Sequence, residues 1–274
     1  MPKINVNDIE IYYELSGPDD APVLVLSNGI MMGSASWAFQ RVVLEKHLRV
    51  LLYDCRGMWQ SDHPDGPYSM QMHADDLAGL LDALGIENAH IAGISYGAEI
   101  SMLFALTYPQ KTKSLIVMAG VSEIHPLLRA QTYPWFLAAE LNDPELLLRT
   151  SYHLNFGEEW IKSNQAFIDA SVERYAQLDM KALSWLMKAF YDFDITNQLN
   201  KINAPTLVIA GANDLIKGPE YAKIIVDNIS SSELVIIPGS GHVLCLEKPD
   251  IINTLLLGFV TKNDQILMKS GGGS

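Results

Sequence analysis

A serine in a glycine-flanked loop is the first residue of this 274-residue sequence that could carry out chemistry. Ser95 is the centre of Gly93-Ile94-Ser95-Tyr96-Gly97, which stands between an apolar run at 89–94 and a helical segment that starts at Ala98. Glycine two positions before and after the serine permits a sharp turn that exposes the hydroxyl group. The pentapeptide alone is a weak signal, but its place between a strand and a helix makes Ser95 the candidate nucleophile.

A base and an acid that could activate Ser95 follow two later apolar runs. A serine hydroxyl is a poor nucleophile near neutral pH, so it needs a base within reach and a third group that orients the base. His242 follows the run 234–237, and Asp214 follows the run 207–210. We therefore predict that Asp214 and His242 are the acid and the base. The alternative acids are Glu123, Asp192 and Asp194, and the other histidines are interpreted as surface or packing residues.

Charge that develops on an attacked carbonyl oxygen requires donors that already point at it, each worth about 3 kcal/mol. The N–H of Tyr96 directly follows the nucleophile at the start of a helix, where the helix dipole adds to its effect. The segment Asn28-Gly29-Ile30 follows another apolar run, and Gly29 allows its backbone to turn inward. Tyr96 and Ile30 are therefore the predicted oxyanion donors.

The elements that must position these residues follow an alternating pattern. Apolar runs without a polar face are typical of strands that helices cover on both sides, as in a mostly parallel sheet. Segments 70–84 and 98–106 have helical apolar spacing between such runs, which indicates βαβ units and an α/β fold. Ile4 to Val6 and Ile9 to Glu14 flank Asn7-Asp8 and predict an antiparallel hairpin at one edge. The remaining predicted strands are 23–27, 50–54, 89–94, 115–119, 207–210 and 234–237.

The alternation stops between residues 125 and 198, where prolines separate amphipathic segments and no strand is indicated. We interpret this region as a helical insertion. It contains 12 of the 24 aromatic residues of the chain. Such rings pack a small helical unit onto a sheet domain, and some of them can line a pocket between the two units. Trp135 and Trp160 of the insertion, with Trp59 outside it, are the candidate substrate-binding residues.

Composition narrows the classes of partner and compartment. The 19 basic and 32 acidic residues give a net charge of −13, which disfavours nucleic acids and anionic membranes as partners. Two cysteines, Cys55 and Cys245, are too few for a disulfide framework and lack the spacing of a thiolate metal site. Neither a leader segment nor an apolar span of about 18 residues is evident. These features predict a cytoplasmic protein with no metal, whereas the oligomeric state is left open.

Together these segments resemble the α/β-hydrolase family over about residues 3–262. Asp54 to Asp62 is similar to the family segment D-x-R-G-x-G-x-S-D, and Gly241-His242 with Glu247-Lys248-Pro249 is similar to its G-H-x-x-x-x-E-x-P ending. The resemblance implies an eight-stranded sheet, a lid between strands six and seven, and no cofactor. With the bounds that the sequence pattern gives, residues 1–124 and 199–265 are assigned to the core, 125–198 to the cap, and 266–274 to a tail that ends in a linker-like Gly-Gly-Gly-Ser.

Within the family, the sequence looks most like 3-oxoadipate enol-lactonases and related esterases, with two departures. Trp59 stands where the family segment usually has glycine, and Asn28 replaces a histidine of the common oxyanion segment. The insertion has six basic residues against ten acidic ones, which favours an uncharged, apolar substrate. Arg129 is the cation nominated there for anion binding, with a solvated helix face as its other interpretation.

The expected activity is hydrolysis of a carboxylic ester or lactone through an acyl-serine intermediate. Two alternatives use the same three residues. One is a ligand-binding receptor or regulator with slow or no turnover, suggested by the aromatic insertion. The other is carbon–carbon bond hydrolysis or acyl transfer. Serine at position 95 excludes the chemistry of an aspartate nucleophile.

Overall fold

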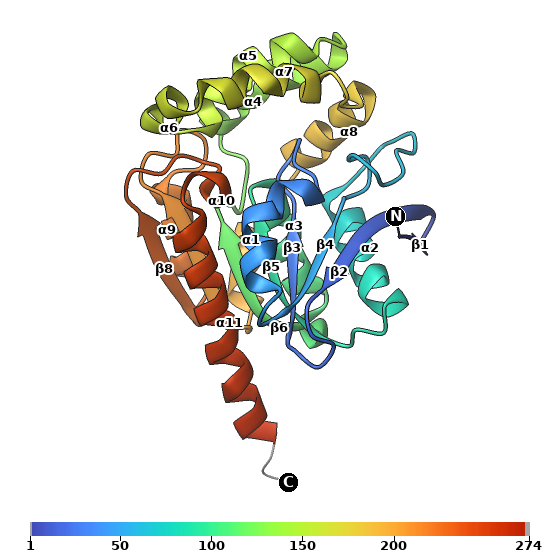
Figure 1. The fold of residues 1–274 in the computed structure, drawn as a ribbon, viewed down its shortest axis with the longest axis vertical. Helices are drawn as coiled ribbons and strands as arrows, with labels where there is room; N and C mark the ends of the chain where they lie inside the picture. The colour runs from blue at the N-terminus through green and yellow to red at the C-terminus, as the bar shows by residue number, and fades with distance from the viewer. Residues whose placement is uncertain (1, 272–274) are drawn as a thin grey trace.

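The chain folds around a mostly parallel, eight-stranded sheet, as a computed structural model of residues 2–271 shows (Figure 1). The strand order is β1-β2-β4-β3-β5-β6-β7-β8, and only β1 and β2 run antiparallel to their neighbours. The predicted edge hairpin and α/β class are confirmed. The strands are β1 (Lys3–Val6), β2 (Ile9–Ser16), β3 (Val23–Ser27), β4 (Arg49–Tyr53), β5 (Ala89–Ile94), β6 (Thr112–Met118), β7 (Thr206–Gly211) and β8 (Ser232–Ile237).

Helices cover both faces of the sheet, which explains why the central strands lack a polar face. Along β3, Leu24 and Leu26 face one hydrophobic cluster, whereas Val25 between them faces the other. The first cluster includes residues of α1 and α11, and the second includes residues of α2, α3 and α9. These helices are α1 (Ala38–Leu44), α2 (Met70–Ala83), α3 (Tyr96–Thr107), α9 (Pro219–Asn228) and α11 (Pro249–Gly271).

A helical layer, defined here as α4 to α8, lies between β6 and β7 in sequence and beyond one end of the sheet in space (Figure 1). An isolated bridge between Glu123 and Asp194 joins the two connections to it. The expected boundary at residue 198 falls inside the short helix η3 (Thr196–Lys201). The helices are α4 (Pro126–Glu140), α5 (Pro144–Asn155), α6 (Glu158–Ser163), α7 (Gln165–Tyr175) and α8 (Met180–Tyr191).

The expected tail beginning at residue 266 continues α11 as far as Gly271. The linker-like residues 272–274 lie outside the described part of the chain.

The segment from Asp54 to Asp62 is a scaffold for the loops at the carboxyl edge. The Arg56 guanidinium is buried and pairs with Asp76 of α2 at 2.8 Å and with Asp8 at 2.6 Å. Asp54 accepts hydrogen bonds from the backbone N–H groups of Ser34 and Gln60, at 2.7 and 3.1 Å. Charge-assisted hydrogen bonds of this kind are about twice as strong as neutral ones, so this segment fixes loops that are far apart in sequence.

Two buried histidines make the stability of the fold dependent on pH. His73 of α2 accepts from or donates to the Tyr96 hydroxyl at 2.9 Å. Burial and the Arg56 charge lower the pKa of His73 to about 3, and burial lowers the pKa of His90 to about 4. In the unfolded chain each imidazole has a pKa of about 6.5. Below about pH 6.5, the unfolded chain therefore binds protons at these histidines that the folded protein does not bind, and the free energy of unfolding decreases.

We predict that protonation of the His73 imidazole in the unfolded chain alone lowers the free energy of unfolding by about 2 kcal/mol as the pH falls from about 7.5 to 5. Replacing the imidazole by the amide of H73Q should make the free energy of unfolding decline less steeply over this range by that amount. Urea denaturation at several pH values measures it. The control is H47Q at an exposed position, which should keep the wild-type slope. Equal slopes for H73Q and the wild type would contradict the prediction.

Candidate active site

Ser95 occupies a strained turn between β5 and α3. Its backbone has φ 54° and ψ −119°, a conformation that costs a non-glycine residue about 1–3 kcal/mol. The two flanking glycines explain how the turn closes. A Cβ on Gly93 would lie 2.0 Å from the Gly97 oxygen, and a Cβ on Gly97 would lie 2.2 Å from the Ser27 oxygen. The pattern therefore brings the start of α3 against the end of β3 and leaves the Ser95 side chain facing outward.

Three predicted side chains form one hydrogen-bonded chain. His242 Nε2 lies 2.9 Å from Ser95 Oγ, and His242 Nδ1 lies 2.8 Å from Asp214 Oδ2. Asp214 Oδ1 accepts the backbone N–H groups of Ile216 and Lys217 at 2.8 and 2.9 Å. Burial acts to raise the pKa of Asp214, but His242 and these hydrogen bonds outweigh it and lower the pKa. An ionised carboxylate can thus hold Nδ1 protonated and leave Nε2 free to accept a proton from Ser95.

The loop that carries His242 is anchored on both sides. The Glu247 carboxylate accepts the backbone N–H of Gly241 at 3.0 Å and that of Gly157 at 3.2 Å. The Asn155 carbonyl, at the end of α5, accepts the backbone N–H of His242 at 3.1 Å. The helical layer therefore positions His242 directly, and the glutamate of the G-H-x-x-x-x-E-x-P pattern fixes the turn before it.

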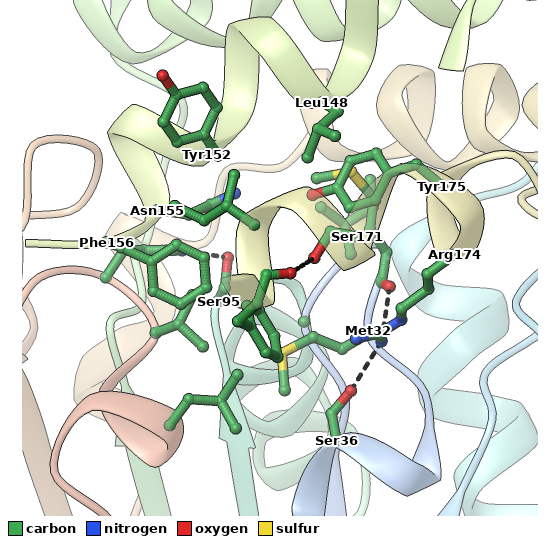
Figure 2. A pocket seen from close by; sticks show the side chains of 18 of the residues that line it. Met32, Ser36, Ser95, Leu148, Tyr152, Asn155, Phe156, Ser171, Arg174 and Tyr175 are labelled. Atoms are coloured by element: carbon green, nitrogen blue, oxygen red, sulfur yellow. Dashed lines mark hydrogen bonds between the residues drawn. The ribbon is translucent and has the colours of Figure 1, made fainter. Parts of the chain in front are cut away.

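A pocket of about 750 Å³, open to solvent, lies between Ser95 and the helical layer. Figure 2 shows Ser95 and Phe156 near one side of the pocket and Arg174 near Met32 and Ser36. A small second cavity, which also borders Ser95 and His242, is lined by Tyr96, Phe190 and Lys217. Further lining residues are Gly29, Ile30, Met31, Trp135, Leu148, Tyr152, Asn155, Phe167, Ile168, Ser171, Tyr175, His242, Val243 and Leu246.

The two segments predicted to supply oxyanion donors border this pocket. Tyr96 is the first residue of α3, so its N–H has no acceptor within the helix. A Cβ on Gly29 would lie 3.5 Å from the Ser95 Cβ, so the loop carrying Ile30 packs against the nucleophile turn. Asn28 is turned away: its amide binds the Tyr53 carbonyl at 2.8 Å, and its oxygen accepts Trp37 Nε1 at 2.7 Å. Asn28 therefore braces the loop.

Of the three tryptophans predicted to contact substrate, only Trp135 lines the pocket. Trp160 does not line the pocket but stacks on the lining residue Phe156, with ring centres 4.1 Å apart. Trp59 lines neighbouring clefts, and its Nε1 donates to the Met31 carbonyl at 3.2 Å. Apolar spacing does not show which ring of an insertion faces a cavity, since that depends on how the helices pack.

The sequence patterns did not identify two basic side chains that lie at the site. Lys217 Nζ and Glu99 Oε2 form a fully buried ion pair at 2.7 Å, which links α3 to the Asp214 loop. Arg174 of α7 lines the pocket, whereas the nominated Arg129 lies over the Tyr191 ring. The spacing of Lys217 three residues after Asp214 is a signal that could have been noticed. Arg174 offers none, because its role depends on the packing of α7.

Among the side chains that the structure describes, those of residues 2–265, no group of three or more histidine, cysteine or acidic residues is arranged to hold a metal ion. None of the described helices is both long enough and apolar enough to cross a membrane.

The fold and the site together define a class of protein, and comparison of the sequence with protein-family models identifies that class. A family model described as "alpha/beta hydrolase fold" matches residues 22–249. The chain therefore belongs to the α/β-hydrolase family, and the resemblance on motifs is confirmed.

Among individual proteins, the chain is similar to several bacterial hydrolases. "Putative carbamate hydrolase RutD" of Azorhizobium caulinodans is 30% identical over 272 residues, or 97% of this chain and 100% of its own. "3-oxoadipate enol-lactonase 2" of Acinetobacter baylyi is 26% identical over 91% of this chain and 92% of its own. The crystal structure of the enol-lactonase from Burkholderia xenovorans LB400 superposes with a TM-score of 0.90 at 25% identity, covering 95% of this chain and all of that one. The chain is a hydrolase by family.

The hydrogen bond between Asp214 and His242 generates a prediction. In D214N, the amide can present its N–H₂ to Nδ1 and favour the wrong imidazole tautomer, so kcat should fall about 10⁴-fold. Hydrolysis of 4-nitrophenyl acetate measures it. The matched control is D192N, which changes an exposed alternative acid and should stay within about threefold of the wild type. Equal losses in the two variants would contradict the assignment.

Proposed function

We propose that the protein is a serine hydrolase that cleaves a carboxylic ester or a lactone through an acyl-serine intermediate. The observation that carries the proposal is the continuous Asp214–His242–Ser95 hydrogen-bonded chain beneath a mostly apolar pocket. The names of the enol-lactonase relatives support a lactone or ester, and the carbamate hydrolase name adds a related acyl substrate. We assign the helical layer, with the expected limits 125–198, the role of a cap.

In the first half of the reaction, His242 Nε2 takes the proton of the Ser95 hydroxyl while Oγ attacks the substrate carbonyl carbon. The carbonyl oxygen becomes negative and lies against the N–H groups of Tyr96 and Ile30. Collapse of this intermediate breaks the bond to the alcohol oxygen, which takes the proton from His242. Ser95 is then acylated, and in a lactone the alcohol stays attached to the acyl chain.

In the second half, a water molecule replaces the alcohol. His242 takes a proton from this water, whose oxygen attacks the acyl carbon. Collapse releases the acid and returns the proton to Ser95 Oγ. The ionised Asp214 stabilises the imidazolium that forms in both halves.

Covalent labelling tests this proposal. A fluorophosphonate should modify Ser95, and short-chain 4-nitrophenyl esters or δ-lactones should be turned over. S95A should lose both the label and at least about 10³-fold of the rate, whereas S163A at an exposed serine should retain both. Mass spectrometry locates the label.

The outcomes separate the alternatives. Labelling of Ser95 without turnover of any ester or lactone would favour a binding protein. Product mainly transferred to an added alcohol would favour an acyltransferase, and cleavage restricted to diketones would favour a carbon–carbon hydrolase. Each of these results would overturn the proposal.

A further inference from the structure

Arg174 is a cation in the pocket wall whose hydrogen bonds go to neutral groups. Its Nη2 donates to Ser36 Oγ at 2.9 Å and to the Met31 carbonyl at 3.4 Å. No aspartate or glutamate among the described residues forms an ion pair with it. In contrast, four other arginines do so, namely Arg41, Arg49, Arg56 and Arg149. Among the described residues, Arg174 therefore has no directly paired carboxylate at the place where a ligand would sit.

The guanidinium retains unused donors in a partly buried position. It has five N–H groups, and its recorded hydrogen bonds use Nη2 alone. Burial lowers the pKa of Arg174, but a guanidinium remains charged. Asp54, the carboxylate that acts on it electrostatically, already accepts the N–H groups of Ser34 and Gln60. The remaining N–H groups belong to a half-buried side chain that lines a pocket open to solvent, so an anionic ligand can replace water on them.

Trp59 holds this guanidinium in place at a conformational cost. The guanidinium carbon of Arg174 lies 5.0 Å from the centre of the Trp59 ring, within range of a cation–π interaction. Trp59 has φ 45°, which is uncommon for a bulky residue. A Cβ on Gly33 would lie 2.8 Å from the ring, so Gly33 provides the space that it fills. A strained aromatic residue and a glycine thus serve to orient Arg174.

Arg174 also lies at a junction. It lines both the Ser95 pocket and a neighbouring open cleft, together with Ser36, Phe167 and Leu246. A substrate whose carbonyl group reaches Ser95 could place a second polar group at Arg174, with an apolar chain between them. A carboxylate fits this position because the planar guanidinium binds its two oxygens side by side.

We propose that Arg174 is a specificity-determining residue that binds a carboxylate carried by the substrate, so that the substrate is a monoanionic ester or lactone with an apolar body. The reaction class rests on the proposed function. The inference corrects the expectation of an uncharged substrate and replaces Arg129 as the anion-binding residue. The net charge of −13 disfavours more highly charged anions.

A pair of esters that differ in this charge tests the proposal. Wild-type protein should have a higher kcat/KM for mono-4-nitrophenyl adipate than for 4-nitrophenyl hexanoate. R174Q should lower the value for the adipate ester about 100-fold and that for the hexanoate ester less than about threefold. R174K, which keeps the charge but loses the planar fork, should fall between them. The matched control is R149Q at an exposed arginine of the same layer, which should leave both values unchanged.

A binding measurement separates this inference from the reaction. In S95A, monomethyl adipate, which is a monoanion, should bind, and in S95A/R174Q its affinity should fall at least about tenfold, as calorimetry would show. Equal affinities in the two proteins, or equal losses for both esters in R174Q, would overturn the inference. Turnover of neither ester together with Arg174-dependent binding of monomethyl adipate would refute the hydrolase proposal and support the anion site.

Discussion

The contact between His242 and Ser95 joins residues 147 positions apart in the chain, and the parallel part of the sheet brings them together. Ser95 follows β5, Asp214 follows β7 and His242 follows β8, and these strands lie in the order β5-β6-β7-β8. Parallel strands end at one edge, so their loops share a small volume. A slip in strand order or direction would separate the three groups even if every local turn remained intact.

The helical layer contributes to this geometry as well as covering it. The Asn155 carbonyl at the end of α5 holds the backbone of His242, and Gly157 shares the Glu247 carboxylate with Gly241. Movement of the layer would therefore change the position of the His242 imidazole. If the layer opened by bending near α5, these hydrogen bonds would be exchanged for water and the orientation of the base would change.

How far the sequence predicts this molecule depends on the range of the interaction concerned. The strands were predictable because burial on both faces leaves continuous apolar runs such as 89–94. The nucleophile turn was predictable because two glycines at fixed spacing are sterically required there. The lining of the pocket was not. Trp160 and Arg174 are both on amphipathic helices, and the face that meets the cavity is set by contacts between helices distant from the sheet.

The two basic side chains at the site carry the same charge but have different roles, one structural and one available to a ligand. Lys217 is fully buried, but Glu99 neutralises it, and an ion pair of this kind adds little net charge while tying α3 to the Asp214 loop. Arg174 is less buried and has no such partner among the described residues, so its charge remains available to a ligand.

Hydrolysis of a monoanionic ester would create a second carboxylate near Ser95, beside the ionised Asp214. A dianionic acid in a protein of charge −13 is repelled as a whole while it is held at one point. The same arginine that selects the substrate would therefore hold the product only weakly against that repulsion.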